Sequence, residues 1–296
     1  MTLSGVLAPL PTPFDDRDEV DLLRLRATLQ HWVASPLTGF VLLGTNGEAG
    51  LVTEDEADQL IEETRRLIPP GRAFIVGAGR ESTRASVQAT KRAAERGADA
   101  VLVRTPSYFK TQMTGDALFR YYSAVADASP IPVLLYNFTA ATGVSLSPET
   151  VARLASHGNI IGIKESGSDP KQLAELVTIS STTFSVLSGS GSTFYAALRT
   201  GAAGGILAVA CLLPDVCVRL FNLVKDKNYT EAEALQQRLL PIARLIPGQH
   251  GVPGLKAALR LSGIDAGLPR GPLRPVGAEV LGQLSAALSR LEGVLA

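Results

Sequence analysis

The sequence is poor in the features that mark secreted and membrane proteins. Only two of its 296 residues are cysteines, Cys211 and Cys217, and both lie in apolar stretches. Two cysteines are too few for the disulfide framework of a small secreted protein, so we expect both to be core residues in a reducing compartment. The longest uncharged run, residues 200–214, is too short to cross a bilayer, and the N-terminus lacks a signal-peptide pattern. The sequence therefore predicts a cytoplasmic protein.

Net charge and metal-binding patterns are lacking as well. The 28 basic residues balance the 28 acidic ones, so charge gives no case for a nucleic-acid or membrane partner. The histidines His31, His157 and His250 are scattered and show no metal-ligand spacing. There is no Gly-x-Ser-x-Gly motif, and no dinucleotide-binding glycine motif follows the first expected strand. We therefore expect a small-molecule substrate and no metal.

The sequence does contain a regular alternation of apolar and amphipathic segments. Eight apolar runs, typical of strands buried on both faces, are separated by stretches typical of amphipathic helices. The runs are residues 6–10, 39–44, 73–77, 100–105, 132–137, 160–165, 184–188 and 205–209. Such alternation predicts parallel strands. Eight repeats favour an α/β fold of the closed (β/α)8 type, the TIM barrel, over a doubly wound open sheet.

The alternation stops after residue 214. Helices are then expected at residues 215–227, 230–245, 255–262 and 277–295, with loops at 247–253 and 267–275. The first of these helices contains part of a barrel helix, and the others form a C-terminal helical extension. We therefore divide the chain into a barrel, residues 1–225, and a C-terminal helical region, residues 226–296.

One charged residue is unusual within these buried runs. The residues Ile-Ile-Gly-Ile at 160–163 lead directly into Lys164, and residues 166–170 are typical of a turn. A lysine buried at a strand end loses hydration of its ammonium group, which favours the neutral amine. The neutral amine is the nucleophile that forms Schiff bases with carbonyl substrates. Alternatively, Lys164 extends into solvent or pairs with the neighbouring Glu165.

Other chemically useful residues fall at expected strand ends, where (β/α)8 barrels hold their active sites. Residues 44–48 form a glycine-rich turn, which is either a carboxylate-binding group of backbone amides or only a tight connection. Tyr136 ends the fifth run, and Arg104 interrupts the apolar fourth run. Residues 188–192, rich in serine and glycine, are typical of a phosphate cradle or of a flexible turn.

The order and spacing of these motifs resemble those of a known family. From about residue 5 to the C-terminus, the chain is similar to the dihydrodipicolinate synthase / N-acetylneuraminate lyase family of pyruvate-dependent class I aldolases. The matching motifs are residues 44–48 (Gly-Thr-Asn-Gly-Glu), 105–108 (Thr-Pro-Ser-Tyr), 135–137 (Leu-Tyr-Asn) with 142–143 (Thr-Gly), and 162–166 (Gly-Ile-Lys-Glu-Ser). The resemblance implies an enzyme of the lyase class.

The resemblance also implies roles for residues at the expected strand ends. Lys164 forms an imine with the keto carbon of pyruvate or a related 2-oxo acid, so that no separate cofactor is required. Tyr136 carries the proton, and Thr45 relays protons to it. The backbone amides of Thr45 and Asn46 hold the carboxylate of the 2-oxo acid.

Three further residues and the assembly follow from the same resemblance. Gly189 and Ile206 match backbone positions near the Schiff base. Tyr108 matches a tyrosine that reaches across a subunit interface into the neighbouring site. The implied assembly is a homotetramer built as a dimer of dimers, and its small-molecule partners are pyruvate and an aldehyde.

The sequence departs from the synthase where the second substrate binds. Ala141 stands in place of the arginine that usually grips the carboxylate of that substrate, and Thr139 replaces the usual proline. Residues 126–133 and 251–256 are most similar to the 4-hydroxy-2-oxoglutarate aldolase branch, which also lacks the arginine and has an asparagine where Asn46 stands. We expect it to cleave or form a 4-hydroxy-2-oxo acid. Arg104 is expected to act as a replacement carboxylate anchor or, alternatively, to form an ion pair in the barrel wall.

Several other functions remain open at this point. One is the 4-hydroxy-tetrahydrodipicolinate synthase reaction of pyruvate with aspartate semialdehyde, and another is that of a 2-keto-3-deoxy sugar acid aldolase or dehydratase. A different class is an isomerase or synthase that binds a phosphate ligand at residues 188–192. A non-catalytic barrel is the last alternative, since a fold does not determine a function.

Overall fold

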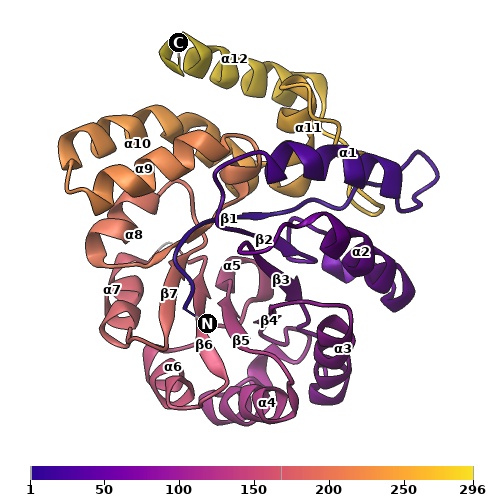
Figure 1. Cartoon of the computed structure of the whole chain (residues 1–296), viewed down its shortest axis with the longest axis vertical. Coiled ribbons are helices and arrows are strands. Elements are labelled where there is room, and N and C mark those ends of the chain that lie inside the picture. The colour runs from indigo at the N-terminus through magenta and orange to yellow at the C-terminus, as the bar shows by residue number, and fades with distance from the viewer. Residues whose placement is uncertain (1, 168, 296) are drawn as a thin grey trace.

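The molecule is built around a closed barrel of eight parallel strands (Figure 1). The computed structural model describes residues 2–167 and 169–295. Each strand pairs with the next along the chain, and β8 pairs with β1 to close the barrel. The strands are β1 (Gly5–Pro9), β2 (Gly39–Leu42), β3 (Ala73–Gly77), β4 (Ala100–Arg104), β5 (Val133–Asn137), β6 (Ile160–Glu165), β7 (Ser185–Ser188) and β8 (Gly204–Ile206). The predicted (β/α)8 barrel is confirmed, and the doubly wound sheet was the wrong alternative.

The barrel is accompanied by helices, most of which cover its outer face (Figure 1). They are α1 (Leu22–Val33), α2 (Glu54–Leu67), α3 (Thr83–Glu95), α4 (Gly115–Ala128), α5 (Thr139–Thr142), α6 (Pro148–Ala155), α7 (Pro170–Thr178), α8 (Phe194–Thr200), α9 (Pro214–Lys225), α10 (Tyr229–Ala243), α11 (Gly251–Leu261) and α12 (Ala278–Leu295). Short single turns occur at η1 (Ala49–Leu51), η2 (Lys110–Gln112), η3 (Ala208–Cys211) and η4 (Arg244–Gln249).

The two largest differences from the predicted boundaries are at β8 and α11. The eighth strand ends at Ile206 and not at residue 209, because the chain turns into η3 at Ala208. Helix α11 begins at Gly251, inside the predicted loop 247–253, because His250 and Gly251 already start the helical turns. The predicted turn at residues 166–170 includes position 168, which lies outside the described residues.

The core has two layers. Inside the barrel, apolar side chains such as Leu7, Val41 and Ile75 fill the axis, while a larger cluster packs between the strands and the helices. Both cysteines are buried and unbridged, as expected for core residues. Trp32 of α1 is fully buried and donates its indole N–H to a backbone carbonyl of η3, at 2.8 Å. Burial on both faces explains why the strands read as continuous apolar runs.

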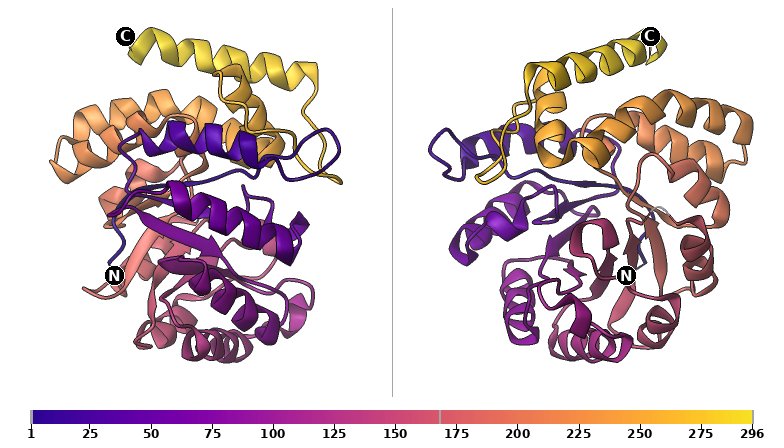
Figure 2. Two further views of the ribbon diagram at one scale, coloured as in Figure 1. Left: turned by 45° about the vertical axis from the view of Figure 1, so that its right-hand side comes forward. Right: turned by 180° about the vertical axis from the view of Figure 1, so that it is seen from behind.

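The C-terminal helices lie to one side of the barrel (Figure 2). Helix α10 contacts α8 and α9, and α12 contacts α10 and α11 as the outermost element. The end of α10 and the turn η4 reach the cavity described below. We retain the division into residues 1–225 and 226–296 as a proposal. Among the described helices, none combines the length and the apolar character required to span a membrane.

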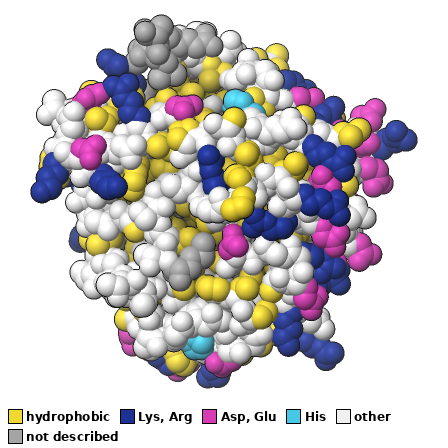
Figure 3. Space-filling model, viewed as in Figure 1, with side chains coloured by type: hydrophobic (Ala, Val, Ile, Leu, Met, Phe, Trp, Pro, Cys, Tyr) yellow, Lys and Arg dark blue, Asp and Glu magenta, His cyan; other side chains and the backbone are white. Residues whose placement is uncertain are grey.

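Charged side chains on the surface are mixed in sign. In the space-filling view, basic and acidic side chains alternate along the flank formed by α2 and α3 (Figure 3). Arg92 and Arg96 of α3 both pair there with Asp58 of α2. Such pairing produces no extended field of one sign on this flank.

Candidate active site

A cavity of about 650 Å³ opens at the C-terminal ends of the strands. This volume lies within the range of small-molecule sites, roughly 300–1,000 Å³. Residues from β1, β5, β6 and β8 and from the turns after β2 and β7 line it, and the turn η4 completes the lining. The cavity brings together six of the residues predicted from the sequence: Thr45, Asn46, Tyr136, Lys164, Gly189 and Ile206.

A β-bulge in β6 sets the direction of Lys164. The pairing of β5 with β6 slips by one residue, because Val133 lies opposite Ile160 whereas Leu134 lies opposite Gly162. Two residues of β6 therefore occupy the space of one residue of β5, which is the definition of a bulge. After the slip, the register places Lys164 directly beside the end of β5.

The bulge reverses the alternation of side chains along β6. Ile161 packs inside the barrel, but Ile163 packs outside it, against the helices. In a regular strand both would face the same side, since side chains alternate with a period of two. The extra residue thus sends Ile163 outward and Lys164 inward. Gly162 permits this arrangement, since a Cβ atom there would lie 2.2 Å from the carbonyl oxygen of Ser185 on β7.

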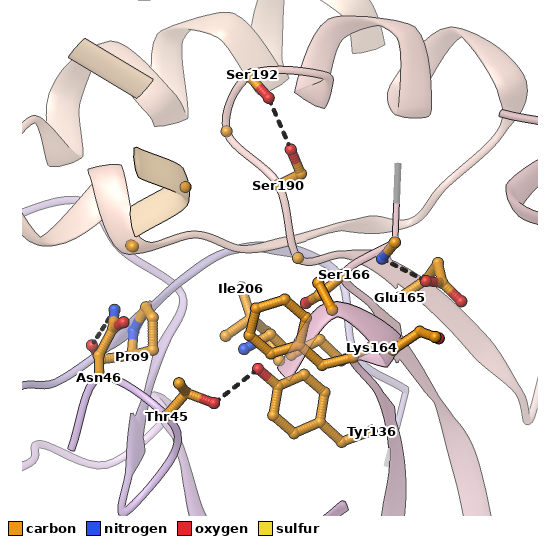
Figure 4. Close-up of a pocket in the computed structure, with 18 of the residues that line it drawn as sticks. Pro9, Thr45, Asn46, Tyr136, Lys164, Glu165, Ser166, Ser190, Ser192 and Ile206 are labelled. Atoms are coloured by element: carbon orange, nitrogen blue, oxygen red, sulfur yellow. Dashed lines mark hydrogen bonds between the residues drawn. The ribbon is translucent and has the colours of Figure 1, made fainter. Parts of the chain in front are cut away.

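The side chain of Lys164 is buried beside a phenol (Figure 4). Lys164 is 4% exposed, and its Nζ atom lies 4.2 Å from the centroid of the Tyr136 ring. The Tyr136 hydroxyl lies 3.0 Å from the hydroxyl of Thr45, close enough for a hydrogen bond in either direction. The amine therefore does not extend into solvent, and the two hydroxyls form a path for a proton beside it.

The turn after β2 presents backbone amides to the same cavity. The N–H groups of Gly47 and Glu48 donate within the turn, to carbonyl oxygens of Gly44 and Thr45. Among the described residues, no acceptor is bonded to the N–H of Thr45 or of Asn46. These two amides are therefore available to a carboxylate.

A buried ion pair between Lys256 and Glu48 anchors the turn after β2. It was not predicted from the sequence. Lys256 of α11 donates to the Glu48 carboxylate at 2.5 Å and to the carbonyl oxygens of Thr12 and Leu268, both at 2.6 Å. The side chains of Lys256 and Glu48 are 2% and 1% exposed. The backbone N–H of Arg270 donates to the second oxygen of the same carboxylate. The C-terminal region thereby holds the residue that follows the cavity turn.

Glu165 does not pair with Lys164. Its carboxylate accepts hydrogen bonds from the Asn137 amide at 2.7 Å, from the Gln172 amide at 3.1 Å and from the backbone N–H of Gly167. Burial raises the pKa of the Glu165 carboxyl, and these donors offset only part of that effect. The alternative of an ion pair between Lys164 and Glu165 was therefore wrong.

Arg104 is not in the cavity that contains Lys164. Its guanidinium donates to Glu81 at 2.9 Å and to the carbonyl of Thr105, and it lines a neighbouring cavity of about 640 Å³. Burial raises the pKa of Glu81, but the backbone N–H groups of Tyr108 and Ser107, with Arg104, outweigh it and lower the pKa to about 2. This geometry matches the predicted alternative, an ion pair in the barrel wall, and we do not propose Arg104 as an anchor.

Of two other predicted features, Tyr108 lies outside the cavity of Lys164, whereas residues 188–192 border it. Tyr108 is 79% exposed and outside the cavity of Lys164. Ser190 and Ser192 line that cavity, with their hydroxyls 3.0 Å apart, so residues 188–192 do not form a separate site (Figure 4). Within residues 2–167 and 169–295, no group of three or more His, Cys, Asp or Glu side chains is arranged to hold a metal.

The fold and the cavity define a class of protein, namely a (β/α)8 barrel with a buried lysine amine at the C-terminal end of its sixth strand. Residues 2–291 match the model of the dihydrodipicolinate synthetase family, and the chain belongs to this family. The family's members are enzymes of the class I aldolase type.

Individual relatives agree with this assignment. The chain is 37% identical to a 4-hydroxy-tetrahydrodipicolinate synthase of Xanthomonas axonopodis pv. citri, over 94% of this chain and 91% of the relative. The crystal structure of a dihydrodipicolinate synthase from Thermotoga maritima superposes with a TM-score of 0.94, at 29% identity over all of both chains. YagE, a prophage protein of the same family from Escherichia coli K12 solved with pyruvate, gives 0.92 at 26% identity over 99% of each chain.

Proposed function

We propose that this protein joins pyruvate to an aldehyde, or cleaves the product, through an imine on Lys164. The observation that carries the proposal is the position of the Lys164 amine, buried and 4.2 Å from the Tyr136 ring centroid. An amine inside a cavity of this kind is placed to attack the ketone of a bound 2-oxo acid. The solved complex of a family member with pyruvate supports the choice of ketone.

The proposed reaction proceeds in successive steps, each of which uses residues of the cavity. The Lys164 amine attacks the keto carbon and water leaves, which gives an imine that withdraws electrons from the adjacent methyl carbon. Loss of a proton from that carbon gives an enamine, which attacks the aldehyde carbon and forms the new carbon–carbon bond. Tyr136 and Thr45 move the protons, and the amides of Thr45 and Asn46 hold the pyruvate carboxylate. Hydrolysis of the imine frees the product and restores the amine.

Two aldehydes are supported by different observations. The names of the relatives support aspartate semialdehyde, the partner in the 4-hydroxy-tetrahydrodipicolinate synthase reaction. Ala141, in place of the arginine that the synthase uses, supports glyoxylate, the partner in the 4-hydroxy-2-oxoglutarate aldolase reaction. Assays of the purified protein with pyruvate and each aldehyde distinguish the two, because only the true partner will be consumed at a substantial rate.

The imine itself is tested independently of the aldehyde. Borohydride reduction in the presence of pyruvate should fix a three-carbon adduct on the peptide that contains Lys164, as detected by mass spectrometry. Absence of the adduct, or its presence only on other lysines, would refute the proposed function.

The role of Tyr108 and the assembly belong to the same proposal. The high exposure of Tyr108 in one chain supports a role at an interface, where it would complete the site of a neighbouring subunit. The proposed homotetramer is tested by sedimentation, and Tyr108→Ala should lower activity only in the assembled form.

A further inference from the structure

The rim of the cavity carries a positive charge that the chemistry at Lys164 does not use. Arg244 lines the cavity where α10 ends, next to Ala243, and its side chain is exposed. Lys164, in contrast, is buried deeper in the same cavity. Among the described lining residues, Arg244 is the only arginine.

Arg244 also differs from Arg104 and Arg270 in its side-chain contacts with the residues that the structure describes. Within the described residues, no carboxylate lies within ion-pair distance of Arg244, and its guanidinium makes no hydrogen bond. Arg104 and Arg270, by comparison, are each paired with a glutamate. An unpaired guanidinium beside a cavity is available to an anionic ligand, and its planar fork matches a carboxylate with two parallel hydrogen bonds.

The two carboxylates that share the lining are already engaged. Glu165 accepts three hydrogen bonds from its surroundings. Asp169 caps the first turn of α7 by accepting from the backbone N–H of Lys171. Neither acid forms an ion pair with Arg244, so neither neutralises its charge.

Another part of the cavity lining is uncharged. The segment that includes Phe138, Thr139 and Ala140 lines the cavity with neutral side chains, and Ala141 follows it. The hydroxyls of Ser190 and Ser192 add neutral donors to the lining (Figure 4). A cavity of about 650 Å³ leaves room for a second small acid beside a three-carbon imine.

We propose that Arg244 binds the carboxylate of the aldehyde that condenses with pyruvate, and so selects aldehydes that carry an acid group. This inference rests on the proposed imine at Lys164. It places the anchor on the C-terminal helical region, so that one end of the second substrate is held by an element outside the barrel strands.

The test compares charged and uncharged aldehydes in one set of variants. With Arg244→Gln, KM for glyoxylate or aspartate semialdehyde should rise roughly 10- to 100-fold, because a charged hydrogen-bond partner is lost. The kcat should stay within a few-fold, and the KM for acetaldehyde should not change. Arg244→Lys should recover part of the loss, since it keeps the charge without the bidentate geometry.

Two controls make the outcome decisive. Arg238→Gln removes an exposed arginine of α10, outside the cavity lining, and should leave every KM unchanged. Borohydride trapping of pyruvate should be equal in wild type and Arg244→Gln. An unchanged KM for the acidic aldehyde, or an equal rise for acetaldehyde, would overturn the role of Arg244 while leaving the imine intact. Failure of wild type to trap pyruvate would instead overturn the proposed function and this role with it.

Discussion

The amine of Lys164 lies over the ring of Tyr136, with 4.2 Å between Nζ and the ring centroid. The two residues are also directly opposite one another in the register between β5 and β6. Their contact is therefore set by backbone pairing and not by flexible loops. The proposed nucleophile and proton carrier, held on two adjacent strands, would have little freedom to lose before reaction, which is the condition for efficient positioning.

Replacement of Lys164 by arginine tests the nucleophile. A guanidinium keeps its proton at any usable pH and cannot form the imine, so Lys164→Arg should abolish turnover and the borohydride adduct. The matched control is Lys171→Arg, an exposed lysine outside the cavity lining, which should retain activity. Measurable turnover by purified Lys164→Arg would contradict the assigned role.

Replacement of Tyr136 by phenylalanine tests the proton path. The ring still packs beside Lys164, but the hydroxyl that lies 3.0 Å from Thr45 is gone. Pyruvate should still bind, while kcat should fall on the order of 10²-fold or more, as for the loss of a proton-transfer group. Thr45→Val, which removes the other hydroxyl at similar volume, should give a smaller fall of the same kind. Single-turnover kinetics with near-normal rates in Tyr136→Phe would rule out this path.

Replacement of Gly162 by alanine tests the bulge. The added Cβ atom would meet the backbone carbonyl of Ser185 at 2.2 Å, and a backbone atom cannot move aside cheaply. We expect Gly162→Ala to lower both stability and the rate of pyruvate trapping, because the direction of Lys164 depends on the strand geometry. Gly50→Ala is the control, since nothing lies within 4 Å of a Cβ atom there. Equal melting temperatures and trapping rates for the two variants would show that the bulge is not needed.

Much of the fold could be predicted from the sequence, because the strands of the barrel are buried on both faces. Each strand then appears as an apolar run, and the run at residues 160–165 is recognisable by the lysine that follows its four apolar or glycine positions. The direction of the Lys164 side chain could not be predicted. Residues 160–163 show no alternation of apolar and polar side chains that would distinguish the inside of the barrel from the outside. Only the register with β5 shows the slip that turns the lysine inward.

The charged groups were harder to assign, because their roles depend on partners far away in the sequence. Arg104 looked available, but Glu81 neutralises it. Lys256 and Glu48 are 208 positions apart, and no local pattern pairs them. Arg244 was not distinguished from other helix arginines, because only the structure shows that the end of α10 borders the cavity.

Replacing only one member of the buried pair of Lys256 and Glu48 should lower the stability of the fold. Lys256→Met leaves the Glu48 carboxylate buried without its cation, which typically costs about 3–5 kcal/mol of unfolding free energy. The double variant Glu48→Gln with Lys256→Met removes both charges and should be less destabilised than Lys256→Met alone. Chemical denaturation measures both values. KM for pyruvate should also rise in Lys256→Met, because the turn that carries Thr45 and Asn46 loses its support.

The ion pair of Glu56 with Arg270 should make stability depend on acid pH. The Arg270 guanidinium, as the main cause, with Thr53 as a further donor, lowers the pKa of Glu56 from its ordinary value of 4.5 to about 2. The folded state thus favours the ionised carboxylate. Its contribution to stability is complete above about pH 4.5 and is lost as the pH falls from there toward 2.

This dependence can be measured with two variants. The difference in Tm between wild type and Glu56→Gln should be largest near pH 7, shrink below about pH 4.5 and vanish near pH 2. Arg270→Gln removes the partner instead and should flatten the same part of the pH profile. A difference in Tm that stays constant from pH 7 to pH 3 would show that Glu56 gains nothing from its ionised form in the folded protein. The link between α2 and the loop that carries Arg270 would then rest on the other hydrogen bonds of Arg270, to the carbonyls of Asp18 and Leu51.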